Sequence, residues 1–245
     1  MSASAYFDAA QAGLEKLRDE QLPGIEAAAE LMADAIAQGR AVFAFGATHS
    51  FILPMELCYR TGGLMLINPI YPHGMDLSVR PMTMTSQIER VPGYGRLLLE
   101  NSPAAAGDVV LLASTSGRNA VVIDMAMAAR EQQMTVIGVT SVEYSTSVPS
   151  RHPSGKRMLD FCDVVIDNCA PLGDAAVQIE GLEQKTGPLS SVLGCVVVNA
   201  IAAEAIARLM ARGIEPPVYI SANMPGGDEH NARLLSEYAD RIHYM

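Results

Sequence analysis

The chain has 245 residues, of which 49% are hydrophobic, and it carries a formal net charge of −10. This is enough apolar material for a sizeable core, in one large domain or two small ones. The acidic balance and the absence of any run of Lys or Arg argue against nucleic acid or an anionic membrane as partner. An anionic small molecule would therefore need locally placed donors.

The sequence also bears on location and redox state. The most apolar stretch, residues 192–203, contains Asn199 and is shorter than the roughly 20 residues that span a bilayer, so no membrane segment is predicted. The N-terminus lacks a basic start followed by an apolar core, so no secretory signal is expected and the predicted location is cytoplasmic. The four cysteines have no metal-like spacing and are predicted to be reduced structural thiols.

The first predicted element is a helix over residues 6–38, with a possible break at Leu22-Pro23-Gly24. Five short apolar runs follow as predicted strands, at residues 41–45, 64–67, 109–113, 135–139 and 164–166. The clearest helices between them cover residues 51–61 and 119–133. Strands and helices that alternate at these lengths predict a three-layer α/β/α sandwich around a parallel sheet.

Two insertions and two further helices complete the expected organisation. Residues 68–103 and 141–157 have weak periodicity, and long insertions of this kind typically serve a site. A long helix over residues 188–212 has apolar residues on nearly every face, which predicts deep burial and a subunit interface. A final helix is expected to be capped by Asp228.

The whole chain, residues 1–245, is expected to form a single domain. It would consist of a helical arm over residues 1–38, a core over residues 39–213 and a C-terminal tail over residues 214–245.

Two predicted strands end in small and hydroxylated residues where a helix should begin. The first turn is Gly46-Ala47-Thr48-His49-Ser50, and the second is Ser114-Thr115-Ser116-Gly117-Arg118-Asn119. Backbone N–H groups at a helix N-terminus are unsatisfied and partly positive, and Ser and Thr hydroxyls add further donors. In a parallel sheet both turns lie at the carboxyl ends of strands. Neither has a common nucleotide fingerprint, so the pair predicts a site for a small anionic ligand.

These two turns resemble those of the sugar isomerase (SIS) domain family of phosphosugar-binding proteins. The resemblance extends to residues 150–156, 181–191 and 225–231, and it covers nearly the whole chain. It implies a SIS-type, flavodoxin-like fold with a five-stranded parallel sheet, assembly as a homodimer or homotetramer, and no cofactor. The fold also serves etherases and regulators that sense sugar phosphates, so it does not decide the reaction.

The resemblance implies an anion-binding set. It consists of the side chains of Ser50, Ser114, Ser116 and Asn119 with the backbone of Thr115 and Gly117. Arg118 departs from the Glu or small polar residue often found at its position, and it either adds positive charge to the site or faces solvent. The alternative role for Ser116 and Asn119 is ordinary helix capping.

The predicted helix over residues 51–61 carries the first candidates for catalysis. Glu56 and Arg60 occupy the offsets at which related isomerases place ionisable site residues. Arg60 stands where some relatives have the catalytic Glu, so Glu56 is the first candidate for the base that moves a proton between C1 and C2 of an opened sugar. The alternative is an ion pair between Glu56 and Arg60, one helical turn apart.

Further candidates lie in loops and in the tail. His49 either polarises the sugar oxygens or only supplies a loop hydrogen bond. Glu183 is the reserve base, and with Lys185 and Thr186 it belongs to a loop that looks like a substrate-contacting segment in relatives. His230 is the candidate to assist ring opening, from a neighbouring subunit. The spacing of the acidic residues and histidines gives no metal-site pattern, so no metal is predicted.

The function predicted from these features is aldose–ketose isomerisation of an anionic, phosphorylated sugar through a cis-enediol. Residues 89–95 would form either a lid over this ligand or a surface turn. Three alternatives remain open: isomerisation of a sugar sulfonate, an etherase or lyase reaction, and a sensor that binds sugar phosphate without turnover. No nucleic acid or membrane partner is expected.

Overall fold

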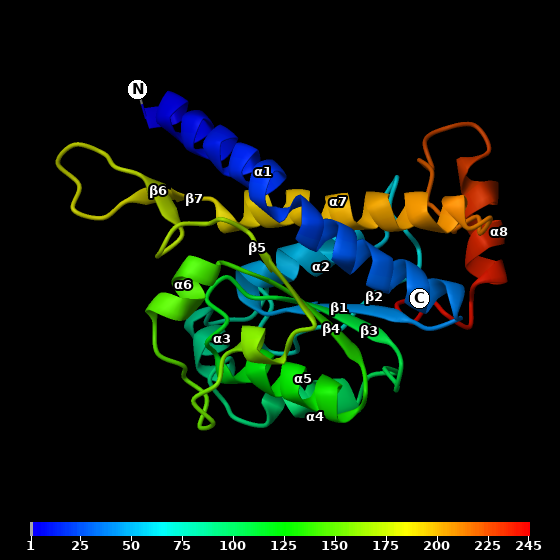
Figure 1. Ribbon diagram of the computed structural model, residues 1–245, viewed down its shortest axis with the longest axis horizontal. Helices are drawn as coiled ribbons and strands as arrows, with labels where there is room; N and C mark the ends of the chain where they lie inside the picture. Colours follow the sequence, from blue (N-terminus) through cyan, green and yellow to red (C-terminus); the bar gives the residue numbers. More distant parts are fainter. Residues whose placement is uncertain (1) are drawn as a thin grey trace.

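The computed structural model describes residues 2–245 and shows a parallel sheet between two layers of helices (Figure 1). The strands are β1 (Val42–Gly46), β2 (Ile67–Pro69), β3 (Val109–Ala113), β4 (Thr135–Thr140) and β5 (Val164–Asp167). All neighbours are parallel in a 5-stranded sheet of order β2-β1-β3-β4-β5. This is the flavodoxin-like strand order, and it confirms the predicted fold class.

Both faces of the sheet are covered. Helices α1 (Ser2–Ala37), α2 (Ile52–Leu57) and α7 (Ser190–Ala211) lie on one face, and α4 (Tyr94–Glu100) and α5 (Ala120–Glu131) lie on the other (Figure 1). Successive strand residues point to opposite faces. In β1, Val42 and Ala44 therefore join the core under α1 and α7, whereas Phe43 and Phe45 join the core over α5. Burial on both sides explains why these strands are continuously apolar.

The remaining elements are short or lie at the ends of the molecule. They are the 3-10 helices η1 (Thr48–Phe51) and η2 (Met158–Phe161), the helices α3 (Thr83–Ile88), α6 (Val142–Ser147) and α8 (Gly227–Glu237), and the strands β6 (Ala175–Val177) and β7 (Thr186–Pro188). The antiparallel pair β6–β7 extends beyond one end of α7, and α8 packs at the opposite end (Figure 1).

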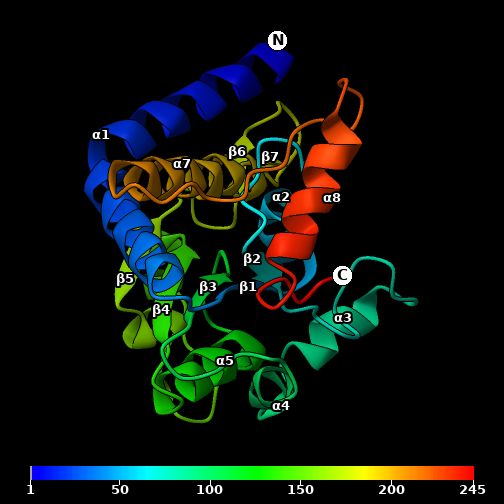
Figure 2. The same ribbon diagram turned by 90° about the vertical axis from the view of Figure 1, so that its right-hand side faces the viewer.

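Helix α1 is continuous over 36 residues, so the possible break at Pro23 does not occur. The helix instead bends in its middle, and its N-terminal half projects from the body as an arm (Figure 2). Proline lacks an N–H and its ring crowds the preceding turn, which kinks a helix without ending it. The C-terminal half then packs against the sheet and α7.

The predicted helix over residues 51–61 is shorter in the structure. It begins with a 3-10 turn, and α2 ends at Leu57. Cys58 is extended, with φ −91° and ψ 138°, and Tyr59 has a φ of +45°. The chain therefore leaves the helix before Arg60, and the Gly62 N–H donates to the Tyr219 carbonyl at 2.8 Å.

The apolar run over residues 64–67 is divided between two partners. Leu64 forms an isolated antiparallel bridge with Val218 of the C-terminal segment, and β2 begins only at Ile67. The expected strand was therefore displaced, because its first residues pair with a segment about 150 residues later in the chain.

Helix α7 is buried on one side only, contrary to the predicted deep burial. The buried side chains of α7 face α1 and α2. The apolar side chains of Val192, Val196 and Met210 on its other side are 41%, 43% and 55% exposed. By length and composition alone α7 is a candidate membrane span, although it packs here as a core helix against the sheet layer.

Helix α8 begins differently from the prediction. Gly226, with a φ of +77°, is its N-cap residue, and Asp228 lies in the first turn without capping it. A carboxylate in the first turn still interacts favourably with the helix dipole.

Candidate functional site

The two hydroxyl-rich turns lie side by side. Strands β1 and β3 are neighbours in register, with Gly46 opposite Ala113, so the segments that follow them meet at one edge of the sheet. Between them is a cleft of about 370 Å³. Its polar lining comes from Thr48, His49, Ser50, Glu89, Ser114, Thr115, Ser116, Asn119, Tyr144, Asp174, Ser190 and Ser191.

The first turn folds back tightly on the end of β1. A Cβ atom on Gly46 would lie 2.4 Å from the Ser50 carbonyl oxygen, so only glycine allows this turn. Thr48 adopts a φ of +52° and its N–H donates to the Met75 carbonyl at 2.9 Å. This geometry presents His49 and Ser50 to the cleft.

The second turn is held by its carbonyls and by one hydroxyl. The Thr115 carbonyl accepts from the Ser141 N–H at 3.0 Å and from the Thr140 hydroxyl at 3.2 Å. Ser114 Oγ accepts the Gly117 N–H at 3.2 Å. Within residues 2–245 the N–H groups of Thr115 and Ser116 have no backbone acceptor. Exposed N–H groups beside three hydroxyls form a cradle suited to an anion.

Asn119 is the N-cap residue of α5, but its side chain makes no capping bond. Its amide instead donates to Glu89 Oε2 at 2.5 Å, and its Oδ1 accepts from Arg151 Nη1 at 3.1 Å. The capping role considered for Asn119 is therefore not the one in the structure. Asn119 connects a guanidinium to a carboxylate at the edge of the cleft.

Glu89 is the cleft residue that sequence reasoning did not assign as catalytic. It follows α3, and its carbonyl accepts the Val121 N–H at 3.1 Å, which fixes this segment to the start of α5. Close packing of α4 on α5 supports the position, because a Cβ atom on Gly95 would lie 1.8 Å from the Val121 carbonyl oxygen. The one feature of the sequence that pointed to Glu89 was the lid considered for residues 89–95, which begins at this residue.

Asp174 also lines the cleft, but its carboxylate is occupied. It accepts the backbone N–H groups of Leu189 and Ser190 at 3.0 and 2.7 Å, and the Ser190 hydroxyl at 2.6 Å. These bonds satisfy the start of α7. Glu89, which has one oxygen bound by Asn119, is thus the carboxylate in the cleft with an oxygen available for chemistry.

Glu56 does not line the cleft of its own chain. Its carboxylate pairs with Arg60 and accepts from Asn199 Nδ2 at 2.8 Å, between α2 and α7. The ion pair with Arg60, considered as the alternative to catalysis, is present in the structure. The catalytic role of Glu56 stays a prediction.

The other predicted residues are spread over the molecule. Glu183, Lys185 and Thr186 are exposed on the β6–β7 hairpin and do not line the cleft. His230 lies on α8, where its Nε2 is 3.3 Å from the Val218 carbonyl oxygen, at the opposite end of α7 (Figure 1). Their proposed contacts with a ligand remain untested predictions.

Gly117 and Arg118 continue the second turn without lining the cleft. Gly117 is buried with a φ of +56°, and Arg118 is half-buried. In residues 2–245 no group of three or more His, Cys, Asp or Glu side chains is arranged to hold a metal ion.

Comparisons with known proteins agree with this fold. The SIS domain model matches residues 5–141. A UPF0309 protein of Shouchella clausii is 43% identical over 240 residues, covering 98% of each chain. A UPF0309 protein of Streptomyces griseus is 43% identical over 243 residues, covering 99% of this chain and 97% of the other.

Solved structures show the same fold at low identity. A phosphoheptose isomerase from Neisseria gonorrhoeae has a TM-score of 0.55 at 16% identity, over 84% of this chain and 97% of its own. A phosphoheptose isomerase from Francisella tularensis has a TM-score of 0.53 at 15% identity, over 83% of this chain and 95% of its own. With the matched domain and the full-length relatives, these findings show that the chain belongs to the SIS domain family and, within it, to the UPF0309 proteins.

Proposed function

We propose that this protein interconverts the aldose and ketose forms of a sugar that carries a phosphate or a similar tetrahedral anion. The observation that carries the proposal is the cleft itself. It joins the anion cradle of the second turn to a carboxylate, Glu89, that is oriented by a hydrogen bond from Asn119. Its volume of about 370 Å³ lies in the range of small-molecule sites.

The anion would bind at the second turn. The N–H groups of Thr115 and Ser116 and the hydroxyls of the same turn can donate to several oxygens of one tetrahedral group. A sulfonate offers the same arrangement of oxygens as a phosphate, so this end of the cleft accepts either. Anchoring the anion places the rest of the sugar across the cleft toward Glu89 and His49.

Glu89 would move the proton. In the open-chain aldose its free carboxylate oxygen would take the C2 proton, which leaves an enediolate that becomes the cis-enediol when O1 gains a proton; as O2 then loses its proton, the carboxyl group would return the first proton to C1 of the ketose. Holding one oxygen by Asn119 leaves the other in a defined direction, as a general base requires. His49, which is exposed and lines the cleft, would exchange protons with the sugar oxygens O1 and O2.

The fold supports the proposal of an aldose–ketose isomerase. The fold is shared with two solved phosphoheptose isomerases. Likeness at this identity supports the class of substrate and not its carbon number or stereochemistry.

The test is exchange of the C2 proton of sugar phosphates in deuterated water, followed by NMR. The wild-type protein should incorporate deuterium into at least one aldose or ketose phosphate. Glu89→Gln should lower the exchange rate by roughly 10²- to 10⁴-fold while binding persists. Glu56→Gln is the matched control, because it makes the same chemical change on a carboxylate outside the cleft and should leave exchange nearly unchanged.

Other outcomes would assign the alternatives. Binding of sugar phosphates with no exchange for any of them would contradict the isomerase and favour a sensor. Release of an ether substituent or loss of water would favour a lyase. Loss of exchange in Glu56→Gln but not in Glu89→Gln would show that Glu56, and not Glu89, is the general base.

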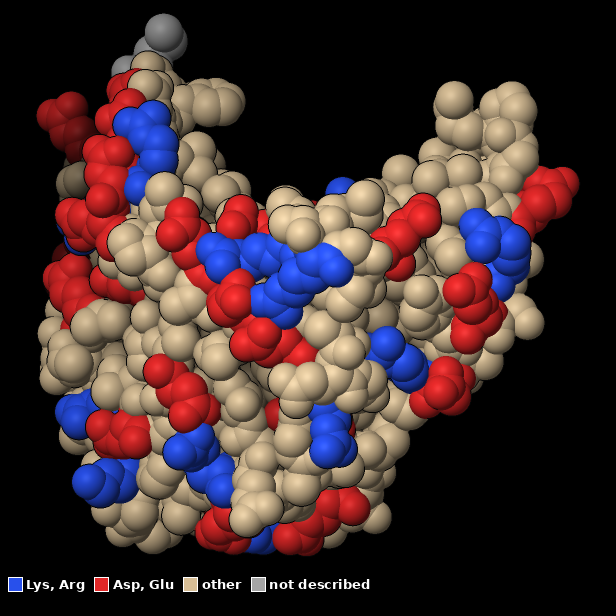
Figure 3. Space-filling model, turned by 45° about the vertical axis from the view of Figure 1, so that its right-hand side comes forward, with Lys and Arg blue, Asp and Glu red and all other residues tan. Residues whose placement is uncertain are grey.

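We also propose that two copies associate through the exposed side of α7 and α2. Val192 and Val196 on α7 and Ile52 and Met55 on α2 are exposed apolar residues of this side. Figure 3 shows a broad hollow between the projecting arm of α1 and the C-terminal end of the molecule, into which a second copy would fit. Light scattering should give a dimer or a larger even assembly, and Val196→Glu should dissociate it. A monomer at all concentrations would contradict this assembly.

A further inference from the structure

Three arginines gather beside the cleft, and the proposed reaction does not use them. Arg118 and Arg151 are joined through the backbone, where the Arg151 N–H donates to the Arg118 carbonyl at 2.9 Å. The Arg151 guanidinium reaches the cleft-lining Asn119 at 3.1 Å. Arg90 directly follows Glu89 in the chain. We call Arg90, Arg118 and Arg151 the arginine rim.

Among residues 2–245 no carboxylate pairs directly with the arginine rim, and Glu89 is linked to Arg151 only through Asn119. Within residues 2–245 none of its three guanidinium groups forms an ion pair, whereas Arg130 and Arg212 elsewhere on the surface do. The Nε atom of Arg118 is buried and has no hydrogen-bond partner. Arginines without partners are notable in a chain with a net charge of −10, which offers many carboxylates.

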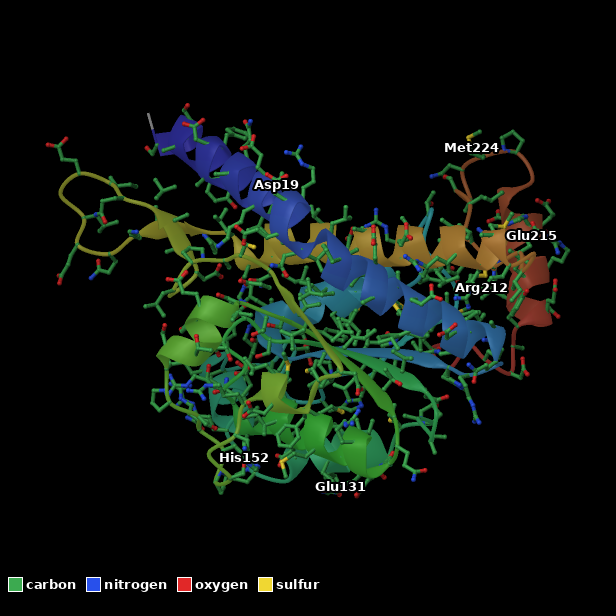
Figure 4. The ribbon with its side chains drawn as sticks, viewed as in Figure 1. Asp19, Glu131, His152, Arg212, Glu215 and Met224 are labelled. Atoms are coloured by element: carbon green, nitrogen blue, oxygen red, sulfur yellow. The ribbon has the colours of Figure 1, made fainter. Side chains whose placement is uncertain are left out.

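The three positive charges repel one another. Desolvation by the neighbouring atoms, and next the nearby charges of Arg118 and Arg90, lower the pKa of Arg151, whereas Tyr144 and Glu89 act in the opposite direction. The single carboxylate of Glu89 does not balance three positive charges, so their mutual repulsion is unfavourable and a bound anion would relieve it. In Figure 4, side-chain nitrogen atoms gather between α6 and the labelled His152, at the end of the molecule that carries the cleft.

We propose that the arginine rim is a second anion subsite, so that the substrate carries two anionic groups. One group, held by the second turn, is that of the proposed function, on which this inference rests. The other, a carboxylate or a second phosphate, lies at the arginine rim on the far side of Asn119. Guanidinium groups bind both kinds of anion through paired N–H donors.

The distances along the chain suit one bifunctional sugar. Ser116 and Arg118 are two residues apart, so their Cα atoms are separated by at most roughly 7 Å. Asn119 and Tyr144 line the cleft, and both lie near the Arg151 guanidinium. A ligand anchored at Ser114–Gly117 can therefore extend past Asn119, at the edge of the cleft, to the arginine rim beside it.

The test compares two ligands that differ by one phosphate. Isothermal titration calorimetry with fructose 6-phosphate and fructose 1,6-bisphosphate should show the bisphosphate binding at least about tenfold tighter to the wild-type protein. The gain should shrink as salt is raised, because Arg90 and Arg151 are exposed. In the double variant Arg90→Gln/Arg118→Gln the gain should fall below about threefold, with fructose 6-phosphate affinity little changed.

The variants avoid the residues that hold the proposed base. Arg151 is left in place because it contacts Asn119, whereas the guanidinium groups of Arg90 and Arg118 make no hydrogen bond or ion pair in residues 2–245. Arg118→Lys, which keeps the charge, should retain most of the gain. Arg233→Gln removes one positive charge from α8, away from the arginine rim, and should keep the full gain in affinity for the bisphosphate.

Equal affinity of the wild-type protein for the two ligands would overturn the subsite. So would a gain in affinity that is the same in the double variant as in Arg233→Gln. In that case deuterium exchange with a monophosphate would still uphold the proposed function. If neither ligand binds and a panel of sugar monophosphates shows no exchange, the subsite and the proposed function fall together.

Discussion

Gly117 allows a quantitative test of how the anion cradle is built. The residue is buried, has a φ of +56°, and lies at the centre of the second turn. A Cβ atom there would lie 3.0 Å from Ser145 Oγ and 3.3 Å from Thr140 Oγ1. Replacement by alanine therefore meets two separate obstacles, the left-handed backbone and the crowded space.

Each obstacle has a known scale. A left-handed conformation costs an L-residue about 1–2 kcal/mol. Displacing a packed neighbour adds about 1–2 kcal/mol, at the low end of overpacking effects. Gly117→Ala should therefore lower the free energy of unfolding by about 2–4 kcal/mol, which corresponds to a fall in Tm of about 4–16 °C for a chain of this size.

Gly155→Ala is the matched control. Gly155 has a φ of +71°, but no atom lies within 4 Å of a Cβ built there, so only the backbone cost of about 1–2 kcal/mol applies. Removing the Ser145 hydroxyl should relieve the closer of the two contacts, so that Gly117→Ala costs less in a Ser145→Ala background than in the wild-type protein and approaches the cost of Gly155→Ala. Urea unfolding followed by circular dichroism measures the wild-type protein, the three single variants and the double variant.

Two results would refute this reasoning. Equal losses for Gly117→Ala and Gly155→Ala in the wild-type background would show that Ser145 does not crowd the turn. Unchanged stability in both would show that neither residue needs the left-handed backbone.

Three further predictions concern one buried and two partly buried groups. Asp108→Ala should lower unfolding free energy by about 2–4 kcal/mol, because the buried carboxylate accepts the Ala41 and Ala105 N–H groups at 2.9 and 2.8 Å; urea titration should show Asp108→Asn losing less. Asp174→Ala should cost about 2–3 kcal/mol, since it removes the acceptor at the start of α7 from a residue with a φ of +69°; a Tm equal to that of Asp174→Asn would contradict this. Burial raises the pKa of Cys162 to about 12, so its thiolate is scarce at pH 8 and grows toward pH 12; iodoacetamide should modify it much faster in urea than in the native protein, as read by mass spectrometry.

The sheet and both turns could be predicted because their signals are local. Continuous apolar runs located β1, β3, β4 and β5 to within a residue or two at each end. Glycine followed by hydroxylated residues located the turns, since tight backbone approach and unsatisfied N–H groups depend on a few neighbouring residues.

Errors arose where a distant segment decided the local structure. The helix expected to reach residue 61 ends at Leu57, because the chain turns to meet Tyr219. Leu64 has the composition of a sheet strand but pairs with Val218. The hydrophobic periodicity of either segment gives no sign that the C-terminal tail packs on it.

By itself, the sequence determined the parallel α/β architecture, the family resemblance and the two turns that form the cleft, because hydrophobic period and turn chemistry act over a few residues. Only the tertiary structure decided which carboxylate reaches those turns. Packing of α4 on α5 brings Glu89 to Asn119, whereas Glu56 faces α7 and pairs with Arg60. Both are glutamates near the end of a short helix. They differ in their distant partners: Glu89 contacts Asn119, 30 positions away, and Glu56 contacts Asn199, 143 positions away.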